Sequence, residues 1–132
     1  MTETVPAGYD QVARLHVFRA AWPDARTWHY PPLWYGAMHV GRWTWTTGPK
    51  NDLRPVLDIL DDFAAIELSR RAAETLWAGW HVCRLSPLSG WTAWREYVRV
   101  DAVDLDDLGA RIGAVEQSVR WAAGWAVEAA GR

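Results

Sequence analysis

The sequence is organised around residues 33–47, the densest aromatic stretch of a chain that contains 11 tryptophans. In the second half of this stretch, Trp43 and Trp45 alternate with polar residues, and a period of two is typical of a β-strand with one buried face. A similar alternation covers residues 26–30, and Pro31-Pro32 separates the two runs. Aromatic and β-branched side chains fit a pleated surface, so we predict an antiparallel meander with strands at 26–30, 33–40 and 42–47.

Three other stretches have the spacing of amphipathic helices. The first covers residues 9–22 and ends before Pro23. The second begins at Asn51 or Asp52 and runs to about residue 78, either as one helix or as two helices broken near Asp61. The third begins after Asp104, an N-cap residue, and has the strongest periodicity of the chain. Its apolar positions alternate in steps of three and four: Leu105, Leu108, Ile112, Val115, Val119, Ala122, Ala126 and Ala129.

Residues 80–85 and 91–100 are separated by a loop of turn-forming residues, which favours a β-hairpin between the two long helices. The predicted fold class is therefore α+β. We expect a small antiparallel, aromatic-rich sheet, made of the meander and the hairpin, to pack against two long helices and a short N-terminal helix. A chain of 132 residues is expected to form a single domain over residues 1–132, with a loose N-terminus at 1–8. No internal repeat is visible.

The composition excludes several classes of protein. The net charge is −2, without the basic excess of a general nucleic-acid-binding protein, so no nucleic-acid partner is expected. Cys83 is the only cysteine, and no intramolecular disulfide can form. The N-terminus lacks the pattern of a signal peptide, and no apolar run reaches the roughly 20 residues needed to span a bilayer. We therefore expect a cytoplasmic protein without membrane association.

Catalytic and metal-binding signatures are missing from the sequence. It contains no nucleophile elbow, glycine-rich phosphate loop or zinc-protease motif, so we assign no catalytic residue and favour a non-enzymatic protein. His81 and Cys83 share one side of a predicted strand, but no second ligand pair accompanies them. We accordingly predict no metal site and no cofactor.

The strongest candidate for a ligand site is an aromatic wall on the meander. Trp28, Tyr30, Trp43 and Trp45 would share one face if the strands pair suitably, with His39 and Arg42 beside them. Such a wall could stack on a ring or hold a cation. The alternative is that these rings form the sheet side of the core. Arg70 is the polar member of an otherwise apolar helix seam, and it either pairs with Glu67 or Glu74 on its own helix or anchors a ligand.

These observations favour a non-enzymatic partner-binding or accessory protein, such as an inhibitor, an immunity-type protein or a small subunit of an assembly. Tryptophan and arginine are enriched at interfaces, and the last helix offers an apolar seam flanked by Trp121 and Trp125 for a protein partner or a second copy. The alternative hypothesis is a small-molecule binder or small enzyme with an aromatic pocket.

Overall fold

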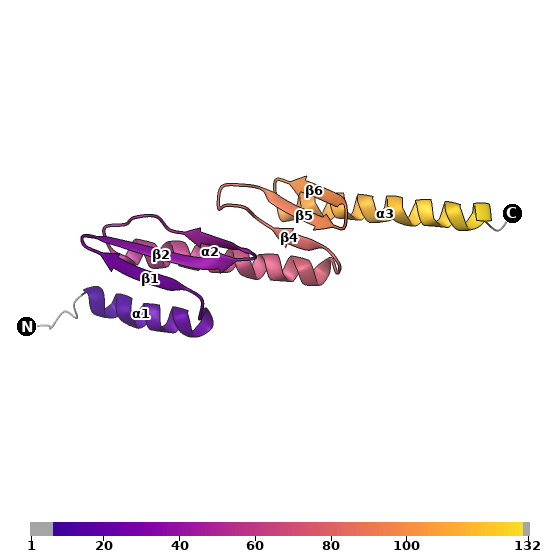
Figure 1. Ribbon diagram of the computed structural model, residues 1–132. Helices are drawn as coiled ribbons and strands as arrows, with labels where there is room; N and C mark the ends of the chain where they lie inside the picture. Colours follow the sequence, from indigo (N-terminus) through magenta and orange to yellow (C-terminus); the bar gives the residue numbers. More distant parts are fainter. Residues whose placement is uncertain (1–6, 131–132) are drawn as a thin grey trace, which may run out of the picture. The chain divides into compact units, whose positions relative to one another are not determined.

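The computed structural model describes the backbone of residues 7–130 and the side chains of residues 10–120. Its described part contains three helices and six strands, and Figure 1 shows their order along the chain. The helices are α1 (Ala7–Ala21), α2 (Leu53–Leu76) and α3 (Leu105–Ala130). The strands are β1 (Arg26–Tyr30), β2 (Leu33–Val40), β3 (Trp43–Thr46), β4 (His81–Cys83), β5 (Trp91–Arg95) and β6 (Val98–Ala102). The predicted α+β class is confirmed.

The strands form two antiparallel sheets, ordered β1-β2-β3 and β4-β5-β6, where we predicted one. The chain divides into two compact units, residues 1–69 and residues 70–132. Helix α2 runs through this boundary as one continuous helix of 24 residues, which answers the question of one helix or two. The single-domain assignment stays a prediction.

In the first unit, the meander forms with the predicted strands, and both of the unit's helices pack on one face, which we call the inner face. Its core joins Met38, Val40 and Trp45 of the sheet to the apolar side of α2 and to Phe18 of α1. Gly36, on the central strand, lets α2 come close, because a Cβ atom there would lie 2.6 Å from a methyl group of Val56.

In the second unit, the structure differs from the predicted hairpin. Residues 91–100 are not one strand, because the chain reverses at Glu96 and Tyr97 and continues as β6. The sequence gives little warning of this turn, since it contains no Gly, Pro or Asn. Glu96 instead adopts a positive φ of 54°, which is uncommon for a residue other than glycine.

Helix α3 begins as predicted and packs against β5 and β6. Asp104 caps it by accepting a hydrogen bond of 2.7 Å from the backbone N–H of Asp107. Leu108 and Ile112 are fully buried, but further along the predicted seam Val119 is 60% exposed. The alanine positions of the seam lie outside the described side chains.

The end of α2 protects the free edge of β4. Arg70 forms an ion pair with Glu74, which confirms one of the two predicted in-helix pairings. Glu74 also accepts a hydrogen bond of 3.3 Å from the backbone N–H of Val82, and Arg70 lies 3.4 Å from the carbonyl oxygen of the same residue. Both backbone groups of this edge residue therefore have side-chain partners, which blocks further strand pairing at that position.

Candidate functional site

The strand register divides the predicted aromatic wall between two faces. Trp28 lies opposite Tyr35, whereas Trp45 lies opposite Met38. Tyr35 and Met38 are three residues apart on β2, so their side chains point to opposite sides of the sheet. The prediction that Trp28, Tyr30, Trp43 and Trp45 share one face is therefore wrong. Alternation fixes the faces within each strand, but only the register relates one strand to the next.

The two rings of β3 belong to the inner face. Trp45 is 4% exposed and meets the ring of Phe63 edge to face, with centroids 5.2 Å apart. Its indole nitrogen is buried, and no hydrogen-bond partner for it exists among the described residues. Trp43 has the same orientation nearer the end of the strand and remains 47% exposed. The core interpretation thus applies to Trp45, while Trp43 lies at the rim of the core.

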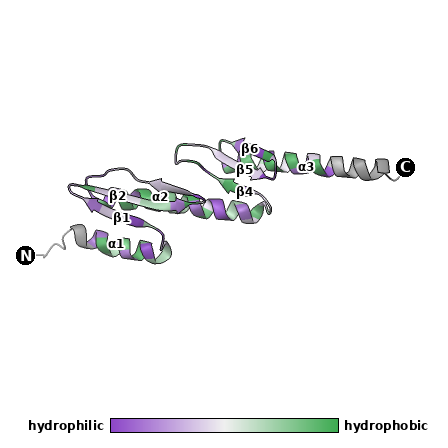
Figure 2. Ribbon diagram, viewed as in Figure 1, coloured by the Kyte–Doolittle hydropathy of each residue, from purple (hydrophilic) through white to green (hydrophobic). Residues whose placement is uncertain are grey.

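The two rings of β1 lie on the other side of the sheet, which we call the outer face. There the ring of Trp28 stacks on that of Tyr35, with centroids 5.5 Å apart and planes within 3° of parallel. Tyr30 lies farther along the same strand and is 74% exposed, while Trp28 is 44% exposed. We call Trp28, Tyr30 and Tyr35 the aromatic face. Figure 2 shows β1 as a hydrophilic strand, which fits an exposed edge.

Tyr35 was not among the predicted site residues, although the sequence contains a signal for its position. Tyr30 pairs with Leu33 across a two-residue turn made by Pro31 and Pro32. Trp28 lies two residues before Tyr30, and Tyr35 lies two residues after Leu33. The pairing of Tyr30 with Leu33 therefore places Trp28 opposite Tyr35. The length of the turn therefore contained the register that the alternation within each strand could not supply.

Polar and cationic residues lie on or near the outer face of the first sheet. His39 lies on the outer face, with its Nδ1 atom 3.2 Å from the hydroxyl of Thr44, and Asp24 accepts a hydrogen bond from its backbone N–H. Arg26 is exposed on the outer face of β1, and Arg42 is exposed in the turn between β2 and β3. The three strands of this sheet contain no Asp or Glu. The outer face thus combines aromatic rings with an exposed arginine, and Asp24 lies at its edge.

The remaining predicted site residues lie elsewhere. Trp121 and Trp125 belong to the part of α3 whose side chains are not described. In β4, the ring of His81 lies 5.4 Å from that of Trp94, while Cys83 is buried. Within the described residues, no three His, Cys, Asp or Glu side chains gather closely enough to hold a metal ion.

Comparison of the chain with family models, with curated proteins and with solved structures finds no significant match. None of the helices in the described part combines the length and apolar character needed to cross a bilayer.

Proposed function

We propose that this chain is a non-enzymatic partner-binding protein of the cytoplasm, and that the aromatic face docks a protein partner. The observation that carries the proposal is the exposed stack of Trp28 and Tyr35 on a sheet whose helices pack on the opposite face. A sheet face that belonged only to the interior would be covered. An exposed cluster of large rings is typical of an interaction surface.

The chemistry of the face supports a protein partner. Tryptophan, tyrosine and arginine supply most of the binding energy at protein interfaces, and aromatic rings have few rotatable bonds to immobilise. Stacking of Trp28 on Tyr35 fixes both rings before a partner arrives, which lowers the entropy lost on binding. Arg26 is exposed on the same face and adds a guanidinium that can pair with a carboxylate of the partner.

A cationic aromatic surface also suits single-stranded nucleic acid, but the balance of charge favours protein. Nucleic-acid sites gain most of their affinity from many cationic contacts to phosphates. This chain has a net charge of −2, and it holds only 14 lysines and arginines in total. Two arginines beside the sheet supply too little cationic charge to follow a phosphate backbone.

The test is capture of partners from a lysate of the native source, comparing wild type with the double variant Trp28→Ser/Tyr30→Ser. The matched control is Tyr97→Ser, because Tyr97 is fully exposed on the β5–β6 turn and lies outside the aromatic face. We expect wild type and the control to enrich the same protein, and the double variant to lose it by about tenfold or more, as for removal of a binding hot spot.

Circular dichroism must show all three proteins folded. A captured set unchanged by the double variant would contradict the proposal. If the protein instead bound a single-stranded oligonucleotide and this binding depended on Trp28, the partner would be a nucleic acid and the proposal would be wrong.

A further inference from the structure

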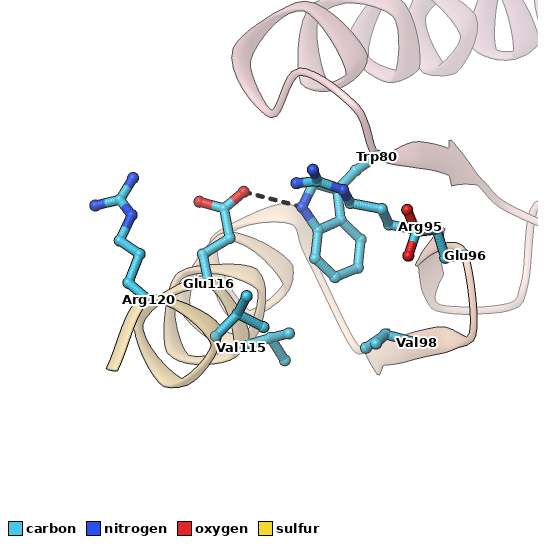
Figure 3. A pocket seen from close by; sticks show the side chains of 8 residues that line it. Trp80, Arg95, Glu96, Val98, Val115, Glu116 and Arg120 are labelled. Carbon is cyan, nitrogen blue, oxygen red and sulfur yellow. Dashed lines mark hydrogen bonds between the residues drawn. The ribbon is translucent and has the colours of Figure 1, made fainter. Parts of the chain in front are cut away.

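The second unit contains a cavity of about 280 Å³ that belongs to none of the surfaces discussed above. It lies between α3 and the turn that joins β5 to β6 (Figure 3). Its lining consists of Trp80, Arg95, Glu96, Val98, Val115, Glu116, Val119 and Arg120. We call it the Trp80 cavity. Its volume lies just below the usual range for drug-sized ligands, so it suits a compound of amino-acid size.

One part of the lining is apolar and fixed in position. The indole of Trp80 is 3% exposed, and its N–H donates a hydrogen bond of 3.0 Å to Oε1 of Glu116. This bond joins the residue before β4 to α3 and sets the orientation of the ring, as Figure 3 shows. Val98 and Val119 are both exposed, although valine side chains favour burial. The apolar surface is therefore available to a ligand.

The other part of the lining carries two positive and two negative side chains. Among the described residues, Arg95, Glu96 and Arg120 have no hydrogen-bond or ion-pair partner. Glu116 uses one carboxylate oxygen for Trp80, which leaves the other oxygen available. A guanidinium binds a carboxylate through paired N–H donors, and a carboxylate accepts from an ammonium group. The cavity thus has binding groups for both charges of a zwitterion.

The balance of charge also selects against other ligands. An anion would meet Glu96 and Glu116 as well as the arginines, and a cation would meet the arginines as well as the glutamates. A ligand that carries both charges can satisfy both sets, since the cavity is neutral overall. Specific recognition then requires the ammonium and the carboxylate to lie on one small molecule beside an apolar group.

The backbone at Glu96 provides a second and independent indication. The two-residue turn between β5 and β6 has a positive φ of 54° at its first position, where glycine is the favoured residue. Strained residues that persist in a fold cluster at ligand sites. Here a glutamate occupies a glycine position, and its side chain lines the cavity.

We propose that the Trp80 cavity binds a free α-amino acid with an apolar side chain. Arg95 binds the carboxylate, Glu116 and Glu96 accept from the ammonium group, and the apolar side chain packs against Trp80, Val98, Val115 and Val119. No covalent step is involved. The inference is independent of the aromatic face, which belongs to the first unit.

The first test uses four probes: L-leucine, N-acetyl-L-leucine, L-leucinamide and glycine. With 11 tryptophans, total fluorescence cannot report on one site. The readout is therefore the indole N–H resonance of Trp80 in ¹⁵N–¹H NMR spectra, assigned with Trp80→Phe, together with calorimetry. We expect L-leucine to shift this resonance in a saturable way. N-acetyl-L-leucine lacks the ammonium group, L-leucinamide lacks the carboxylate, and glycine lacks the apolar side chain. Each should bind at least about tenfold more weakly than L-leucine, as for loss of a charge-assisted contact.

The second test uses Arg95→Gln, Glu116→Gln and the control Arg99→Gln. Glutamine at position 116 keeps an oxygen for the indole N–H of Trp80, so the fold should persist. We expect both cavity variants to weaken leucine binding about tenfold or more and the control to bind as wild type. Glu96→Gly should weaken binding while raising the melting temperature, because glycine relieves the positive φ.

Three results would overturn the proposal. The first is the absence of any saturable shift with L-leucine at about 10 mM, a concentration that occupies most of a millimolar site. The second is N-acetyl-L-leucine binding as tightly as L-leucine, which would make the cavity a simple anion site. The third is leucine binding that neither Arg95→Gln nor Glu116→Gln weakens.

Discussion

The two units share the same order of strands and helix, but different side chains form their cores. Each has a three-stranded antiparallel sheet followed by a helix, α2 in the first unit and α3 in the second. At matching central positions, Met38 faces Trp45 in the first sheet, whereas Ala93 faces Val100 in the second. The first sheet therefore supplies bulky core side chains. In the second unit, buried tryptophans at the strand ends supply the bulk: Trp80 precedes β4, and Trp91 is the first residue of β5.

Each unit has a close contact at a glycine, which lies on a strand in the first unit and on a helix in the second. In the first unit the glycine lies on the sheet, since Gly36 leaves room for Val56 and Leu60 of α2. In the second it lies on the helix, since Gly109 leaves room for the ring of Trp77, 2.7 Å from the position of an added Cβ atom. Gly36 thus lies at a contact between the sheet and a helix, whereas Gly109 lies at a contact between α3 and the segment that follows α2.

The largest expected change in stability concerns the side chains that the first sheet contributes to its core. We predict that Trp45→Ala lowers the free energy of unfolding by about 3–5 kcal/mol, because it removes a buried ring and leaves a cavity against Phe63. Trp43→Ala, on the same strand and face but half exposed, should cost about 1 kcal/mol or less. Urea unfolding followed by circular dichroism measures both.

Equal losses for the two variants would contradict the assignment of Trp45 to the core and Trp43 to its rim. A third variant sharpens the comparison. Trp45→Phe keeps an aromatic ring against Phe63 and removes the buried indole N–H that lacks a partner. Because an unpaired buried donor costs about 1–3 kcal/mol, this variant should lose much less stability than Trp45→Ala.

Short-range patterns in the sequence predicted most of the helices and strands. The positions of the candidate sites depend on contacts between residues that are distant in the sequence. Alternation and the Pro31-Pro32 break gave the meander, and the cap at Asp104 gave the start of α3. The outer position of Trp28 follows only from the register. The turn at Glu96 has no glycine to indicate it. The Trp80 cavity joins residues from three distant segments, so no window of sequence contains it.

The second prediction concerns the two contact glycines. Gly36→Ala should lower the free energy of unfolding by about 1–3 kcal/mol, because the new Cβ atom forces Val56 or its helix to move. An added Cβ atom at position 109 meets only the ring of Trp77, whereas one at position 36 crowds Val56, Leu60 and Thr47. We therefore expect a smaller net loss for Gly109→Ala than for Gly36→Ala.

Helix α3 contains its own control for this experiment. Gly113 lies one turn after Gly109, and an added Cβ atom there would have no neighbour within 4 Å. Gly113→Ala should therefore stabilise the protein by about 0.5–1 kcal/mol through helix propensity alone. If Gly109→Ala stabilised the protein as much as Gly113→Ala, the close contact with Trp77 would be disproved. Thermal unfolding of the three variants side by side gives the comparison.

The smallest expected effect tests the outer face of the second sheet, where a polar network lies beside the ring pair of His81 and Trp94. The hydroxyl of Thr92 donates a hydrogen bond of 2.8 Å to Asp101, and Arg99 lies 3.1 Å from the same oxygen. These two contacts, the first the larger, lower the pKa of the Asp101 carboxyl. Because the folded pKa is lowered, the stabilisation is fully present above the unfolded value of about 3.9 and is lost as pH falls through the folded pKa.

We predict that Thr92→Val raises the pKa of Asp101 towards its ordinary value, because it removes the stronger of the two contacts. Arg99→Gln should raise the same pKa by a smaller amount. The measurement is a ¹³C NMR titration of the carboxyl carbon in wild type and both variants. Identical titration curves would show that the polar network does not form on this face. The contrast between a hydrogen-bonded network on the second sheet and stacked rings on the first would then be lost.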